Sequence, residues 1–199
     1  MQIKIYRYME PIFIPIGIDC WPASTLIYHK LRHFSLPFDW TITYNGVSDI
    51  IKKRFDNYLP ISHTNTINVA SNTVFLHQKF PESYDKLERR INRFLNLLEN
   101  SKQRLIFIKK GHNFCHHEKA KKDGCILKND ITDCEELHKL LSEKYPNLKY
   151  KIVLFLSCGK CFDSSKIYKS KNIVIYNIAE LEVNNRKFTD LFEQIYKTL

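Results

Sequence analysis

The sequence predicts one α/β domain over residues 1–199, with a mostly parallel sheet covered by helices on both faces in three layers. Three observations support this prediction. From about residue 73 onwards, apolar runs of strand length alternate with segments of helical periodicity. The runs are almost continuously apolar, which is typical of parallel strands that are buried on both faces. The chain is also long enough, and at 44% hydrophobic residues apolar enough, to form one such core.

Strands are expected where the apolar runs occur. The sequence predicts them at 12–18, 73–78, 104–110, 150–157 and 171–178. Residues 60–72 are polar and rich in turn-forming types, which indicates a loop with room for one short strand. Residues 111–129 are rich in His, Lys and Cys, and we expect an irregular insert there.

Helices are expected between the strands. The segments 22–33 and 46–59 each place apolar residues along one face. The clearest helix spans 81–102, where Pro81 opens a segment whose apolar residues recur every three or four positions. Further helices are predicted at 130–146 and 185–199, with a short one between the last two strands.

Composition limits the classes of function. The net charge of +10 favours polyanionic partners, but the basic residues are scattered and accompany no RNA-recognition or zinc-finger pattern. Specific nucleic-acid binding is therefore not expected. No apolar run approaches the ~20 residues of a membrane span, and the first residues do not resemble a signal peptide. We expect a cytoplasmic, intracellular protein whose six cysteines are reduced.

Cys20 is the first candidate for a functional residue. It directly precedes a helix opened by Pro22, and the positive end of a helix favours a thiolate. Asp19 would oppose thiolate formation if it lay close to the sulfur. A cysteine becomes an effective nucleophile when a base completes the pair, and His77, near the end of a predicted strand, is placed to act as that base. A buried structural thiol and a packed histidine are the alternatives.

Asp39 is the second candidate, within the tetrapeptide Pro-Phe-Asp-Trp. Its neighbours Phe38 and Trp40 are large apolar anchors, so the carboxylate should be partly desolvated and should need a partner. Arg32, Ser35, a backbone N–H or a catalytic histidine could serve. The alternative is that Asp39 only caps the turn that follows.

Taken together, three segments resemble the family of putative papain-like cysteine peptidases, a domain of unknown function. The segments lie within residues 12–110, about half of the chain. The residues that carry the resemblance are Gly17, Cys20, Leu31, Arg32, Ser35, Pro37, Phe38, Asp39, Trp40, His77, Phe80, Arg89, Arg90, Arg93, Phe94 and Phe107. The resemblance implies that Cys20 is a nucleophile, that His77 is its base and that Asp39 orients the histidine.

The resemblance and the periodicity differ on the fold. A papain-like fold combines a helix bundle with an antiparallel sheet or barrel, whereas the alternation of strands and helices predicts a parallel sheet. Because fold and function are separate questions, we follow the periodicity for the fold. Residues 111–199 are then expected to be a βα extension of the same domain.

A group of basic residues is a candidate phosphate site. Arg89, Arg90 and Arg93 lie on the polar side of the 81–102 helix, and Lys109 and Lys110 end the strand that follows. Guanidinium and ammonium groups bind phosphate well. No glycine-rich G-x-G-x-x-G loop is present, so the ligand would be a phosphate-bearing molecule or nucleotide sugar held by side chains. A solvated helix face is the alternative.

Two further pairs of residues are each separated by two positions, a spacing that is common for zinc ligands. His112 and Cys115 follow one strand, and Cys158 and Cys161 follow another, so neighbouring strands would bring four zinc ligands together. The alternatives are a surface loop and a turn, or a redox role for the two later cysteines.

The first hypothesis is therefore a cysteine-dependent hydrolase or transferase that acts on a peptide, amide or similar acyl bond and needs no cofactor. The N–H groups that begin the first helix would hold the oxyanion. A domain that binds a phosphate-bearing ligand and a zinc-stabilised interaction module are the alternatives.

Overall fold

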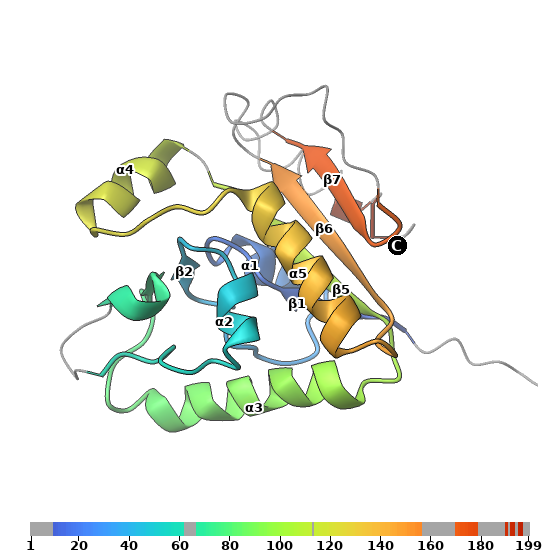
Figure 1. Cartoon of the computed structure of the whole chain (residues 1–199), viewed down its shortest axis with the longest axis horizontal. Helices are drawn as coiled ribbons and strands as arrows, with labels where there is room; N and C mark the ends of the chain where they lie inside the picture. The colour runs from blue at the N-terminus through green and yellow to red at the C-terminus, as the bar shows by residue number, and fades with distance from the viewer. Residues whose placement is uncertain are drawn as a thin grey trace, which may run out of the picture.

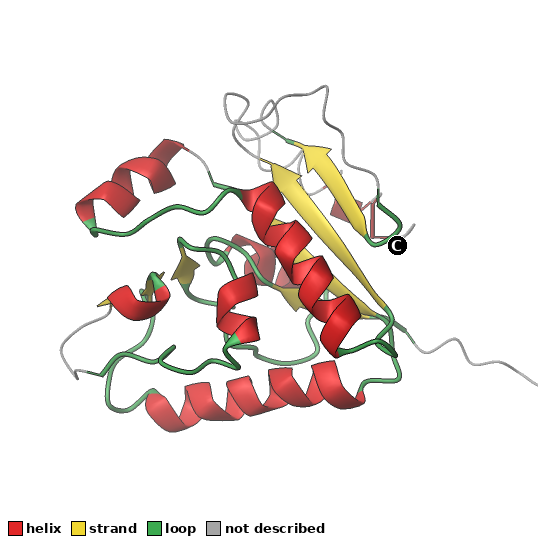
Figure 2. Cartoon of the chain, viewed as in Figure 1, coloured by secondary structure: helices red, strands yellow, loops and turns green. Residues whose placement is uncertain are grey.

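The computed structural model describes residues 10–61, 67–112, 114–156 and 170–178, together with positions 190, 192, 193, 195 and 196. Its main element is a four-stranded sheet in which all neighbouring strands are parallel. In order across the sheet, the strands are β1 (Ile12–Pro15), β5 (Leu105–Lys110), β6 (Tyr150–Leu156) and β7 (Ile173–Asn177). The predicted parallel α/β architecture is thereby confirmed (Figure 2).

Helices cover both faces of this sheet: α1 (Trp21–Tyr28) lies on one face, and α2 (Ser48–Lys52), α3 (Tyr84–Asn100) and α5 (Asp130–Lys144) lie on the other. A further helix, α4 (Phe114–Lys122), packs through Ala120 beside the small antiparallel sheet. Successive residues of β5 point to opposite faces, so Phe107 joins a core with α2, α3 and α5, whereas Ile108 joins a core with α1. Figure 1 shows α5 crossing in front of the strands and α3 running along one side of the molecule.

The two early helices are shorter than predicted. α1 ends at Tyr28 because Lys30 has a φ of 58°, and the N–H of Leu31 returns to the carbonyl of Leu26, a pattern that closes a helix. α2 ends at Lys52 because Arg54 also has a positive φ, of 54°.

The strand predicted at 73–78 is wrong in its length and its partners. β4 comprises only Thr73–Val74 and pairs antiparallel with β2 (Ile42–Thr43) and β3 (Ile67–Asn68) in a separate sheet. Two-residue strands are too short to leave a periodic pattern. His77 therefore lies in a turn after a small antiparallel sheet, not at the end of a parallel strand.

The second half of the chain follows the predicted order, with one correction. Residues 111–129 are not irregular throughout, because they contain α4. The described positions between 190 and 196 are helical, in agreement with the predicted last helix. The short helix predicted between β6 and β7 lies outside the described residues. No helix in the described ranges is long and apolar enough to cross a membrane.

Phe38 fixes the Pro-Phe-Asp-Trp turn in the core. Its side chain is fully buried, and its ring centroid lies 5.3 Å from that of Phe55, 5.9 Å from that of Tyr58 and 5.7 Å from that of Phe94. This aromatic cluster joins the turn to α3, so the tetrapeptide is primarily an anchor between segments that are distant in sequence.

A buried ion-pair network connects the sheet to α5 and α2. Lys109 of β5 is fully buried, and its Nζ lies 2.8 Å from Oδ2 of Asp133 and 3.5 Å from Oδ1 of Asp130. The backbone N–H groups of Val47 and Ser48, where α2 begins, donate to the same Asp133 carboxylate. The Asp133 carboxylate of α5 therefore binds both strand β5 and the beginning of helix α2.

The charges of this network stabilise one another. Burial acts to lower the pKa of Lys109, but the carboxylates of Asp133 and Asp130 outweigh it and raise that pKa. Burial acts to raise the pKa of each carboxyl, but the Lys109 ammonium, together with hydrogen bonds from His112 to Asp130 and from Ser48 to Asp133, lowers both pKa values below their usual range. Gly46 makes room for the network: its φ is +72°, and a Cβ there would lie 2.3 Å from the Asp133 carboxyl.

Replacing Asp133 tests the importance of this network. Asp133→Ala should lower the free energy of unfolding by roughly 3–5 kcal/mol, because Lys109 would stay buried without its nearest partner. Glu143→Ala, which removes an exposed partner of Lys139 in the same helix, should cost less than about 1 kcal/mol. Urea denaturation measures both. Similar small losses in the two variants would contradict the assigned role.

Candidate functional site

The carboxyl edge of the parallel sheet brings two segments of the sequence together. β1 leads to Cys20 and α1, and its neighbour β5 leads through Lys110 and His112 to α4. The arrowheads of β6 and β7 point toward the end of the molecule where α4 lies (Figure 1). In open parallel sheets, ligands bind at this edge. Here it carries a cysteine, several histidines and two aspartates.

Cys20 is the N-cap residue of α1 and is half-buried. Its own side chain does not cap the helix. The neighbouring Asp19 does so instead, because its Oδ1 accepts a hydrogen bond from the Trp21 N–H at 2.8 Å. Gly17 permits this tight turn, since a Cβ at that position would lie 2.4 Å from the ring of Pro22. The turn therefore presents Asp19 and Cys20 side by side at the end of β1.

The local charges set the state of the Cys20 thiol. Burial and the Asp19 carboxylate raise its pKa, and the Lys110 ammonium acts in the opposite direction. The thiol is therefore the resting form at neutral pH. The effect anticipated for Asp19 from the sequence is confirmed, and a base is needed for Cys20 to act as a nucleophile.

Asp19 also holds a histidine from α4. Its Oδ2 lies 3.4 Å from Nε2 of His116 and 3.7 Å from Nζ of Lys110. Burial acts to raise the pKa of Asp19, but these two partners and the Trp21 N–H lower it below its usual range. Lys110 also lies over the ring of Trp21, with its Nζ 5.8 Å from the centroid. Carboxylate, histidine and ammonium thus surround the segment that carries Cys20.

A second aspartate–histidine pair lies beside the first. Asp130 Oδ2 is 2.9 Å from Nδ1 of His112 and accepts the backbone N–H of the same residue at 2.8 Å. The ring centroids of His112 and His116 are 6.3 Å apart. Since Asp130 also pairs with Lys109, the buried network positions this histidine.

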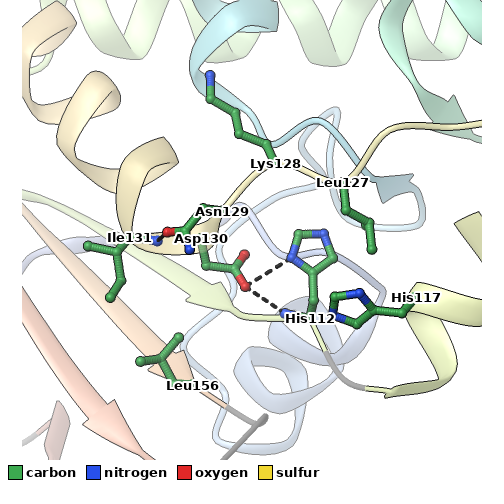
Figure 3. A pocket seen from close by; sticks show the side chains of 8 residues that line it. All are labelled: His112, His117, Leu127, Lys128, Asn129, Asp130, Ile131 and Leu156. Atoms are coloured by element: carbon green, nitrogen blue, oxygen red, sulfur yellow. Dashed lines mark hydrogen bonds and ion pairs between the residues drawn. The ribbon is translucent and has the colours of Figure 1, made fainter. Parts of the chain in front are cut away.

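His112 opens onto a cavity of about 260 Å³ (Figure 3). His117, from α4, faces it, with the two ring centroids 6.2 Å apart. The remaining lining residues come from the segment before α5, from its first turn and from the end of β6: Leu127, Lys128, Asn129, Asp130, Ile131 and Leu156. The carboxyl edge therefore contains both chemically reactive side chains and a space beside them.

The structure does not join the predicted triad through any contact between described residues. His77 is exposed, and its ring lies edge-on to that of Trp40, with 5.8 Å between centroids. Asp39 is fully buried, where it accepts from the Arg32 guanidinium and, at 3.0 Å, from the Leu36 N–H. Burial raises the pKa of Asp39, and the Arg32 guanidinium opposes that shift. Asp39 thus closes its own turn with two of the partners expected from the sequence.

The predicted phosphate cluster is divided among three places. Lys109 is buried between Asp133 and Asp130, and Lys110 faces Asp19. Arg89 is exposed on α3, and Arg93 donates to the Ser35 carbonyl at 2.7 Å. Arg90 lies near Asp39 and Arg32, and it lines a cavity together with Trp40 and His77.

The predicted zinc ligands are described only in part. His112 is placed as above, but Cys158, Cys161 and the side chain of Cys115 lie outside the described structure. Among the side chains that are described, no group of three or more His, Cys, Asp or Glu residues could hold a metal ion. The zinc site stays a prediction.

Comparison with known families adds to this geometry. Residues 12–83 match the family model of the putative papain-like cysteine peptidases. The resemblance expected from the sequence is confirmed for that segment, which is shorter than the expected 12–110. No curated protein and no solved structure matches the chain significantly.

The matched segment contains Cys20, Asp39 and His77, and it ends just before α3. Within this structure it forms the edge strand β1, helices α1 and α2 and the small antiparallel sheet. His116, which lies 3.4 Å from Asp19 in the cysteine turn, belongs to α4 and lies outside the segment.

Sequence reasoning missed His116 and the pairing of Asp130 with His112. One signal was available, since both histidines follow the predicted strand at 104–110, and the carboxyl ends of parallel strands are where ligands bind. What the sequence did not reveal was that β5, rather than another strand, is the neighbour of β1.

Replacing Asp19 tests the electrostatics of this edge. Asp19→Asn should lower the pKa of the Cys20 thiol, because it removes the negative charge that raises that pKa. Cys20 should then be alkylated by iodoacetamide faster at pH 7 than in the wild type, measured by site-resolved mass spectrometry. Cys125, another half-buried thiol, should be unaffected. Slower alkylation of Cys20 in Asp19→Asn would contradict the assigned charge arrangement.

Proposed function

We propose that this protein is a cysteine-dependent hydrolase in which Cys20 attacks an acyl carbon and His116 acts as its base. One observation carries the proposal: Asp19 directly precedes Cys20 and its carboxylate lies 3.4 Å from His116. A nucleophile, a base and an orienting carboxylate are the parts of a nucleophilic acyl-transfer site. The match of residues 12–83 to the putative papain-like cysteine peptidases supports the same reaction class.

The reaction follows from these roles. His116 accepts the thiol proton as the sulfur of Cys20 bonds to the carbonyl carbon of an amide. The tetrahedral intermediate collapses, the carbon–nitrogen bond breaks, and the imidazolium gives its proton to the leaving amine. Water, activated by the same imidazole, then hydrolyses the thioester and restores the thiol. Asp19 stabilises the imidazolium that forms in each half of the reaction.

The oxyanion needs a different partner from the one expected from the sequence. The Trp21 N–H donates to Asp19, and Pro22 has no N–H, so the first turn of α1 offers few donors. Lys110 is the nearest cation, since it lies 3.7 Å from Asp19 and acts to lower the pKa of Cys20. We assign the stabilisation of negative charge at this site to Lys110.

The base assigned by the family resemblance, His77, is the competing choice. It lies in the turn after β4, next to Trp40, and no hydrogen bond or ion pair among the described residues joins it to Cys20 or Asp39. Asp39 is already held by Arg32 and the Leu36 N–H. The geometry therefore favours His116 and Asp19 over His77 and Asp39.

Acylation by p-nitrophenyl acetate tests the proposal. The wild type should form an acetyl thioester at Cys20, detected by site-resolved mass spectrometry, and Cys20→Ala should abolish nitrophenol release beyond the background reaction. His116→Asn should slow acylation about a hundredfold or more, as expected for the loss of a general base. His77→Asn should keep the wild-type rate.

Two controls make the test decisive. Cys125→Ser should leave acylation unchanged, and thermal unfolding should show that each variant is folded. An unchanged rate in Cys20→Ala would refute the proposed nucleophile. A slow His77→Asn with a normal His116→Asn would assign the base to the family segment instead.

A further inference from the structure

We propose that a hydroxyl-bearing phosphate monoester, such as a sugar phosphate or nucleotide, binds in a second cavity formed by Trp40, His77, Gln78, Lys86 and Arg90. This cavity has a volume of about 330 Å³ and shares no lining residue with the cavity beside His112. It lies between the Pro-Phe-Asp-Trp turn, the turn after β4 and the first half of α3. The proposal does not depend on the chemistry of Cys20.

The cavity combines two cations on one helix face. Lys86 and Arg90 are one turn apart in α3, so their side chains lie on the same side of the helix, and both line the cavity. Like charges at this spacing destabilise a helix unless an anion lies between them. A phosphate group, which accepts hydrogen bonds from ammonium and guanidinium groups together, would relieve that repulsion.

Arg90 has unused hydrogen-bonding capacity. Its Nη1 is buried and has no hydrogen-bond partner among the described residues. Both hydrogen bonds that the nearby Asp39 carboxylate accepts, from Arg32 and from the Leu36 N–H, go to its Oδ2, and its Oδ1 is buried without a partner among the described residues. Arg32 and Arg93 add positive charge on the same side. Around one carboxylate, the described residues therefore gather more positive charge than it can balance, which favours a dianion over a neutral ligand.

The other lining residues indicate what is attached to the phosphate. Gln78 is 5% exposed, and its Oε1 is buried without a hydrogen-bond partner. A buried acceptor of this kind is costly unless a ligand group donates to it. A hydroxyl of a sugar or ribose would do so, and the rings of Trp40 and His77 offer apolar surface to the body of the ligand. The combination fits a phosphate monoester with hydroxyl groups better than free phosphate.

Isothermal titration calorimetry with the full chain tests the site. Glucose 6-phosphate and AMP are the probes, with inorganic phosphate, glucose and acetate as comparisons at one ionic strength. We expect saturable one-to-one binding of at least one of the two organic phosphates, tighter than that of inorganic phosphate, and no binding of glucose or acetate. Lys86→Gln and Arg90→Gln should each weaken binding about tenfold or more, because each removes a charge-assisted hydrogen bond.

Variants matched in charge distinguish binding at this cavity from non-specific attraction to a positively charged surface. Arg89→Gln removes the same charge as Arg90→Gln from the neighbouring, exposed position and should bind as the wild type does. Lys86→Gln, whose side chain takes no part in the buried core, keeps the test valid if Arg90→Gln fails to fold. Cys20→Ala should bind normally, so failure of the proposed hydrolase leaves this result independent. No saturable binding of either organic phosphate, equal weakening in Arg89→Gln, or acetate binding as tight as that of the organic phosphates would overturn the proposal.

Discussion

A fully buried lysine on the inner strand β5 constrains the rest of the structure. Lys109 can remain charged in the core only because Asp133 and Asp130 of α5 lie against it. The first carboxylate also accepts the N–H groups that begin α2, and the second also holds His112. A shift of α5 by one residue would leave a buried charge without its partner. This network therefore fixes the register between the sheet, two helices and the segment that leads to α4.

The candidate site depends on that register. β1 and β5 are neighbours, so the turn that carries Cys20 and the segment that carries His112 leave the sheet at the same edge. α4 then returns His116 to Asp19, the residue before the cysteine. The Asp19 carboxylate, which lies 3.4 Å from His116, also raises the thiol pKa of Cys20. In the proposed reaction, the same carboxylate would hold the base in position beside a thiol that is protonated at rest. Reactivity would then require proton transfer at the moment of attack.

The sequence predicted the elements that have strong patterns. Strands β5, β6 and β7 are continuous apolar runs, and α3 repeats apolar residues every three or four positions, so both were found. The small antiparallel sheet was missed because its strands have two residues each. α4 was missed because basic and histidine residues obscure any apolar stripe. The place of Cys20 before a helix was predictable from the sequence, whereas the approach of His116 in α4 to Asp19 depends on strand neighbours that local patterns do not reveal.

The match to putative papain-like cysteine peptidases does not conflict with the parallel sheet, because the same catalytic chemistry can occur on different folds. The central claim is that Cys20 works with His116 and not with His77. Cross-linking with dibromobimane, a short reagent that bridges two thiols, tests this geometry directly. With Cys115 replaced by serine, His116→Cys should yield a bridge between Cys20 and position 116, identified by mass spectrometry, and His77→Cys should yield none to position 77. A bridge to position 77, with none to position 116, would contradict the account.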